Sequence, residues 1–135
     1  MLAGHILGRV ERWLGLAVGG ALGALGRYWV TGWVHQWGGP GFPWGTLGVN
    51  LIGSFLLGFV VQTSVIAGWS AELRLFVAVG FLGAFTTFST MAYETLELLR
   101  AGQGTEALAY VGLNLVLGVL LVALGMAAVA VLRGA

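Results

Sequence analysis

Four apolar segments, each about as long as a lipid bilayer is thick, fill most of this chain. They are residues 14–34, 45–66, 73–99 and 107–132. A helix of about 20 apolar residues crosses the hydrocarbon core of a membrane. Only 8% of the residues are charged, whereas a soluble domain has roughly 25%. The sequence therefore predicts an all-α integral membrane protein with four transmembrane helices in a single domain, residues 1–135, which leaves no room for a soluble domain.

The third segment contains the run GFLGAFTTFSTM, residues 80–91, in which two close glycines are followed by four hydroxyl side chains. Gly loosens a helix, and Ser and Thr compete with its backbone for hydrogen bonds. We therefore expect the third helix to be broken at mid-membrane. Its first half would end in the carbonyl groups of residues 80–83, and its second half would begin at Thr87. Such a break survives only where it is buried in protein, lines a wet cavity or holds an ion.

Small and polar residues recur at every fourth position in two other segments, so they lie on one face of each helix. The two stripes are Asn50, Ser54 and Gly58 in the second segment and Tyr110, Asn114 and Gly118 in the fourth. An Asn inside a membrane helix is often only a hydrogen-bonded clamp between helices, and Asn50 alone would favour that interpretation. Two polar stripes beside a broken helix favour a polar pathway instead.

Two charged residues, Arg27 and Glu94, lie within predicted spans. A charge at this depth is costly unless it faces a polar cavity, pairs with another group or extends to the membrane surface. Both interpretations stay open for Arg27: a side chain that reaches the headgroups, or one that lines a pore vestibule. Glu94 lies next to the polar face of the third segment, and this position favours a functional role.

Glycines in the first segment are spaced for close helix packing. Gly15, Gly19 and Gly23 follow one another at intervals of four, with Gly20 alongside. Small residues at this spacing let two helix backbones approach closely in a membrane. This face is therefore suited to close contact with another helix.

Several classes of function are excluded by the residues that the sequence lacks. It contains no Asp, Lys or Cys, and Ser54 and Ser89 have no base in register, so an enzyme is not expected. A net charge of +1 without charge runs gives no case for nucleic acid. An uncharged lining of hydroxyls, amides and aromatic edges suits a small desolvated anion. Four helices cannot both enclose a pore and pack their own centre, so the pathway is expected at the interface with a second copy, in a homodimer.

Three runs carry a resemblance to a known family. They are GRY at residues 26–28, GTLGVNLIGSFLLGF at residues 45–59 and GFLGAFTTFST at residues 80–90. Together they resemble the Fluc family of fluoride channels, also called CrcB proteins, and the likeness covers nearly all of the chain. It implies an antiparallel, dual-topology homodimer in the bacterial or archaeal cell (inner) membrane. Such a dimer has two pathways for passive fluoride export from the cytoplasm and a central structural sodium ion.

The resemblance also assigns roles to particular residues. It places the fluoride pathway on Asn50, Phe88, Met91, Ser89, Thr90, Tyr110, Asn114, Glu94 and Arg27. It places the sodium ligands on the backbone carbonyls of Gly83 and Thr86. This chain departs from the family pattern at two positions, with Asn114 where the family has Ser and Met91 where most members have a second Phe.

Orientation in the membrane is open at this point. The arginines near span ends divide unevenly between the two sides, which favours a single orientation, whereas the resemblance implies both. Arg9, Arg12, Arg74 and Arg133 lie on one side and Arg100 on the other, with Arg27 possible there.

Two other functions remain as alternatives to a fluoride channel. The first is a small proton-coupled exporter of cationic compounds, in which Glu94 would have to carry the proton. The second, a non-transporting scaffold, leaves the break and the polar stripes without a purpose.

Overall fold

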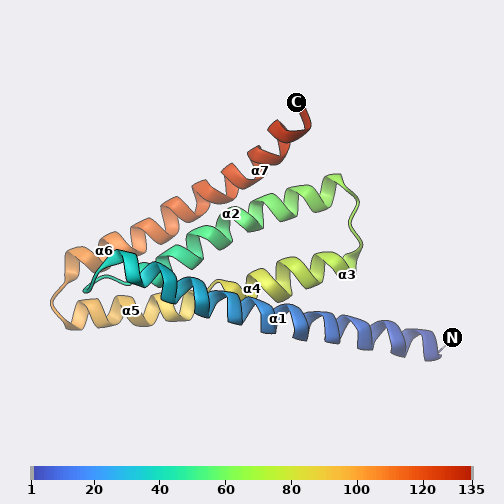
Figure 1. The fold of residues 1–135 in the computed structure, drawn as a ribbon, viewed down its shortest axis with the longest axis horizontal. Coiled ribbons are helices and arrows are strands. Elements are labelled where there is room, and N and C mark those ends of the chain that lie inside the picture. Colours follow the sequence, from blue (N-terminus) through green and yellow to red (C-terminus); the bar gives the residue numbers. More distant parts are fainter. Residues whose placement is uncertain (1, 135) are drawn as a thin grey trace.

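The computed structural model describes residues 2–134, and every regular element in that part of the chain is helical. The elements in order are α1 (Leu2–Gly38), α2 (Trp44–Ile66), α3 (Ala71–Arg74), η1 (Leu75–Leu82), α4 (Gly83–Phe85), α5 (Phe88–Arg100), α6 (Gly104–Gly112), η2 (Leu113–Leu117) and α7 (Gly118–Gly134) (Figure 1). The stretches η1 and η2 are wider, π-helical turns that continue the α-helices on either side. The elements α3 to α5 together form one long segment, and α6 to α7 form another. With α1 and α2, the described chain thus has four helical segments.

Within the described part of the chain, three segments are long and apolar enough to cross a membrane. They are Trp44–Ile66, Ala71–Arg100 and Gly104–Gly134. Their positions agree with three of the predicted spans, and their length and composition are consistent with a membrane protein. The helix α1 is 37 residues long. It is less apolar, because it contains several Gly and Trp residues and the charged Arg27. Its role as a fourth span stays a prediction.

Short loops reverse the chain after each segment. Those near residues 39–43 and 101–103 lie at one end of the molecule, and the loop near residues 67–70 lies at the other (Figure 1). The first turn contains Gly39 and Gly41 with φ angles of 75° and 94°, which residues other than Gly rarely adopt. Consecutive segments therefore run in opposite directions.

Glycines set the distance between neighbouring helices. A Cβ atom added at Gly19 of α1 would lie 2.7 Å from the carbonyl oxygen of Phe76, in η1. Gly23 meets the backbone of Phe81 in the same way, so this part of the predicted glycine face is confirmed. Gly15 has no neighbour within 4 Å and does not belong to the contact.

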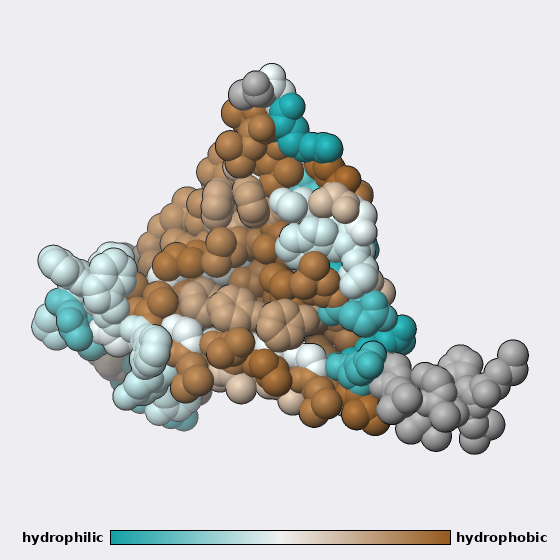
Figure 2. All heavy atoms as spheres, turned by 45° about the vertical axis from the view of Figure 1, so that its right-hand side comes forward, coloured by the Kyte–Doolittle hydropathy of each residue, from teal (hydrophilic) through white to brown (hydrophobic). Residues whose placement is uncertain are grey.

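The buried apolar core is small and lies towards one end of the molecule, between α2, α5 and α6. It consists of Leu47, Met91, Leu98, Ala107 and Tyr110. Most large apolar side chains are exposed instead. Figure 2 shows apolar residues across the middle of one face and hydrophilic residues gathered towards its ends, the distribution of a surface that contacts lipid.

The predicted break in the third segment is confirmed, but it lies later than expected. Helix α4 ends at Phe85, and the extended residues are Thr86 (φ −86°, ψ 159°) and Thr87 (φ −150°, ψ 113°). The expectation that the first half ends at residues 80–83 is wrong. Gly80 stays in the π-helical stretch η1, packed against Gly19. The chain opens instead at two β-branched threonines, which favour extended backbone.

Candidate functional site: a polar network at the helix break

The side chain of Asn50 holds both backbone groups of Thr87, the second residue of the break. Its Oδ1 atom accepts a hydrogen bond from the Thr87 amide at 2.9 Å, and its Nδ2 donates to the Thr87 carbonyl oxygen at 3.2 Å. Asn50 lies on α2, 37 residues earlier in the chain. The carboxamide therefore replaces the helical partners that Thr87 loses where the helix opens.

A chain of hydrogen bonds continues from Asn50 into the fourth segment. Asn50 Nδ2 donates to Asn114 Oδ1 at 2.9 Å, and Asn114 Nδ2 donates to the carbonyl oxygen of Tyr110 at 2.9 Å. The Tyr110 hydroxyl donates to Glu94 Oε2 at 2.6 Å, and the Thr46 hydroxyl donates to Glu94 Oε1 at 2.9 Å. The two polar stripes predicted from the sequence thus meet each other and the broken helix in one network.

Hydroxyl groups cap the start of α5, on the far side of the break. The Thr87 hydroxyl accepts from the Thr90 amide at 3.2 Å and donates to the Thr90 hydroxyl at 2.9 Å. The Ser89 hydroxyl lies 3.5 Å from that of Thr87. Thr86 turns the other way, because its hydroxyl donates to the carbonyl oxygen of Leu82 at 3.1 Å. Three hydroxyls therefore lie together at a helix N-terminus, where the helix dipole favours negative charge.

Two hollows lie beside the break, and Thr87 lines both. The first has a volume of about 290 Å³, and Asn50, Phe88 and Asn114 are among its lining residues. The second has a volume of about 780 Å³ and is lined by Arg27 and Glu94 together with several aromatic residues of α1. The polar network thus separates a small uncharged hollow from a larger one whose wall carries both charge signs.

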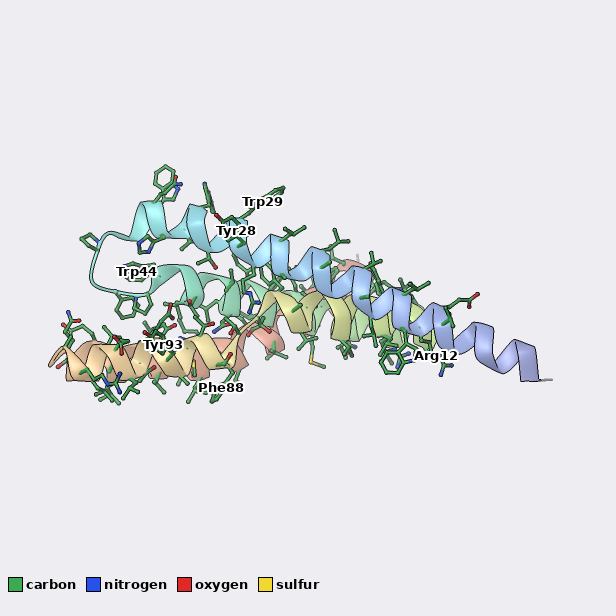
Figure 3. All side chains as sticks on the ribbon, turned by 90° about the horizontal axis from the view of Figure 1, so that it is seen from below. Arg12, Tyr28, Trp29, Trp44, Phe88 and Tyr93 are labelled. Carbon is green, nitrogen blue, oxygen red and sulfur yellow. The ribbon has the colours of Figure 1, made fainter. Side chains whose placement is uncertain are left out.

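The exposed residues of the predicted site lie on the outside of α5. Phe88 is 74% exposed, and in Figure 3 it points away from the helices, whereas Tyr28 and Trp29 project from α1 on the opposite side. Ser89 is also exposed. Met91 is 6% exposed and belongs to the apolar core, although it also lines the smaller hollow.

The structure therefore joins most, but not all, of the residues that the sequence singles out. Asn50, Asn114, Tyr110 and Glu94 are connected by hydrogen bonds in one chain. Arg27 shares the larger hollow with Glu94. Among the described residues it forms no ion pair with that carboxylate.

Two parts of the site were not among the predicted pathway residues: the hydroxyl of Thr46 and the backbone of Thr87. Thr46 precedes Asn50 by four positions, so the spacing that defines the polar stripe could have extended the stripe to it. The role of the Thr87 backbone carries no such signal, because it depends on which residue of another helix lies opposite.

The fold and the network define a class: a small helical membrane protein in which one segment is discontinuous and its break is bonded to a polar side chain of a neighbouring helix. The chain belongs to the CrcB family, since residues 14–126 match the family model described as CrcB-like protein, Camphor Resistance (CrcB). The resemblance stated from the sequence is thereby confirmed.

Curated bacterial relatives agree with this assignment. The chain is 53% identical to the fluoride-specific ion channel FluC of one Thermus thermophilus strain over 116 residues, which are 86% of this chain and 91% of the relative. It is 51% identical to the same channel of a second strain of that species over 86% of this chain and 93% of the relative. It is 47% identical to that of Hahella chejuensis over 83% and 89%. These relatives are named as channels, in agreement with the expectation that the chain is not an enzyme.

Proposed function

We propose that this protein is a passive, fluoride-selective channel that lets fluoride leave the cytoplasm. The observation that carries the proposal is the network around Thr87, in which amides and hydroxyls without fixed charge surround a helix N-terminus. Such donors replace the water around a small anion. The relatives in Thermus thermophilus are named for the same activity.

Selectivity in this proposal comes from the polar groups that line the smaller hollow. This hollow of about 290 Å³ is lined by side-chain amides and by the exposed ring of Phe88. The positive edge of an aromatic ring attracts an anion. A small anion approaches these donors more closely than a large one, and it gains more electrostatic energy as a result. Fluoride is therefore favoured over chloride.

A second copy of the chain completes the pathway in this proposal. Phe88 forms part of the wall of the smaller hollow, yet it is 74% exposed. An antiparallel partner would supply the missing wall of this hollow. Two pathways per homodimer follow from the two-fold symmetry. The pair sits in the cell (inner) membrane with α1 as the fourth span of each copy.

A structural sodium ion fits the break. Among residues 2–134, the backbone hydrogen bonds formed outside single helices include none to the carbonyl oxygen of Gly83 or of Thr86. These two groups lie at the carbonyl end of α4, where the helix dipole is negative. Gly83 and Thr86 of both copies would hold the ion. A bound cation supplies positive charge that satisfies carbonyls left without amide partners.

Ion efflux from liposomes tests the proposal and its alternative. The purified protein should release trapped fluoride rapidly and passively, with far slower loss of chloride. Comparable chloride flux would refute fluoride selectivity. Exchange of cationic compounds driven by a proton gradient would favour the small proton-coupled exporter, in which Glu94 would have to release the hydrogen bonds it accepts from Thr46 and Tyr110.

A further inference from the structure

We propose that a groove between the last turns of α2 and α7 binds the headgroup of a phosphatidylethanolamine. Its phosphate pairs with Arg133, and its ammonium group meets the carbonyl end of α2. The groove lies at the end of the molecule that carries the loop near residues 67–70 (Figure 1). This lipid site goes beyond the proposed channel function, because it holds whichever ion the pathway carries.

The groove begins where the close contact between α2 and α7 ends. Gly58 packs against the backbone of Val122, and Gly125 packs against the backbone of Phe55. Beyond these contacts a hollow of about 260 Å³, the end hollow, separates the two helices. Its wall includes Phe59, Thr63 and Ile66 from α2 and Leu132 and Arg133 from α7. Helices that touch in the middle of the molecule are therefore apart in their last turns.

The end hollow lies on the side of α2 that faces away from the pathway. Successive residues of an α-helix are about 100° apart. The three α2 residues in its wall therefore lie opposite the α2 residues that line the smaller hollow, which are Asn50, Ser54 and Leu57. In the proposed dimer the partner covers the smaller hollow. The end hollow is left to lipid rather than to a second copy.

The end hollow is at the level of the lipid headgroups. The apolar segments Trp44–Ile66 and Gly104–Gly134 both end beside it, and such segments end at the surface of the hydrocarbon core. Large apolar side chains nearby are exposed, with Val65 at 64% and Val131 at 71%. A headgroup in the end hollow would therefore leave its acyl chains along the apolar surface of the two helices.

Arg133 supplies the charge that a lipid phosphate requires. Of the described residues that line the end hollow, it alone is charged. Its side chain is exposed, and within the described part of the chain it forms no ion pair. Arg12, by contrast, pairs with Glu72 at 3.2 Å. A guanidinium without a carboxylate partner can bind a phosphate through two parallel hydrogen bonds.

The end of α2 supplies carbonyl groups for the ammonium. The carbonyl oxygens of Thr63 and Ser64 accept hydrogen bonds from amides that follow the helix, whereas the backbone bonds formed outside single helices in residues 2–134 include none to Val65 or Ile66. Carbonyls at a helix C-terminus carry the negative end of its dipole. A primary ammonium can donate to them, but the quaternary ammonium of phosphatidylcholine cannot. Phosphatidylglycerol has no cationic group for this position.

A buried hydroxyl in the same wall has no partner. Within the described residues, Thr63 Oγ1 is the only buried side-chain oxygen or nitrogen that forms no hydrogen bond. Such groups are rare because they lose their bonds to water without replacement. In the proposed complex the Thr63 side chain rotates about its Cα–Cβ bond, and its hydroxyl donates to an ester oxygen of the lipid.

Native mass spectrometry of the full-length protein tests the headgroup. The protein is released from micelles that contain phosphatidylethanolamine, phosphatidylcholine and phosphatidylglycerol in equal amounts and with identical acyl chains. We expect one phosphatidylethanolamine per copy of the chain to be retained. Its retention should exceed that of either other lipid by at least about tenfold, as for one hydrogen bond to a charged group. Equal retention of the three lipids, or a preference for phosphatidylglycerol, would overturn the proposal.

Arg133→Gln tests the position of the site. Saturating phosphatidylethanolamine should raise the unfolding temperature of the parent protein by about 5 °C relative to phosphatidylcholine. The variant should lose this difference. Arg74→Gln is the matched control, because Arg74 is exposed at the same end of the molecule but does not line the end hollow. This control should respond like the parent.

Equal losses in the two variants would show that the lipid answers to the general positive charge of this end, and would overturn the site. The comparison of headgroups uses the parent protein alone, so it decides the proposal even if a variant fails to fold. A parent protein that passes no fluoride would refute the proposed function and leave this lipid site standing.

Discussion

An alanine at Gly19 should destabilise the protein, whereas an alanine at the adjacent Gly20 should not. The new Cβ atom at position 19 would lie 2.7 Å from the carbonyl oxygen of Phe76 and 3.1 Å from the amide nitrogen of Phe81. Ordinary contact begins at 3.4 Å, so α1 must move away from η1 by roughly 0.7 Å. At Gly20 nothing lies within 4 Å, so the extra methyl group meets no other part of the chain.

The difference between the two variants isolates the steric cost. Gly→Ala in a helix gains up to about 1 kcal/mol of intrinsic propensity, and this gain is common to both positions. Overpacking costs about 1–3 kcal/mol, so Gly19→Ala should be less stable than Gly20→Ala by that amount. Chemical denaturation in detergent micelles measures both free energies of unfolding. Equal stabilities would show that α1 and η1 do not touch at Gly19, and would refute the argument.

Three further predictions concern the site itself. Tyr110→Phe removes the hydroxyl that donates to Glu94 at 2.6 Å, which should cost about 1.5–3 kcal/mol of stability, as for a hydrogen bond to a charged acceptor; thermal unfolding measures it. Phe88→Ile should slow fluoride efflux from liposomes and leave assembly unchanged, whereas Tyr93→Ile, at a comparably exposed position outside the smaller hollow, should conduct like the parent. Replacing sodium with a larger organic cation should lower the unfolding temperature. Thr86→Ala should retain this sodium response, because the backbone supplies the ligand. Loss of the response in the variant would contradict the proposed site.

The helical segments were predictable because hydrophobicity and span length fix them with little help from tertiary contacts. The second predicted span, 45–66, differs from α2 by one residue. The break was placed too early because glycine was taken as the weak point. Gly80 instead remains in η1, where the lack of a side chain lets it pack against the backbone of Gly19. At this point of the chain, glycines such as Gly80 serve close packing, and the β-branched threonines open the helix.

The partners of the polar residues could not be predicted, because they depend on how each helix is rotated about its axis. The sequence places Asn50 and Asn114 on polar stripes, and a four-residue spacing is enough for that. It does not show that Asn50 faces the backbone of Thr87, since residues 37 positions apart have no fixed geometry. The same limit applies to Met91, which lines the smaller hollow as expected but also packs in the apolar core. The sequence pattern did not suggest this second environment.

A helix break and an anion pathway make opposite demands on the same donors. The break leaves an amide and a carbonyl of Thr87 without helical partners, and each must be satisfied within the membrane. A donor that satisfies the backbone is no longer free for an ion. Asn50 meets the first demand with its Oδ1 atom and one of its two N–H groups. Its other N–H is donated to Asn114 Oδ1, and Asn114 donates in turn to the carbonyl oxygen of Tyr110. The two asparagines are therefore not interchangeable, because only Asn50 bonds to the backbone of the break.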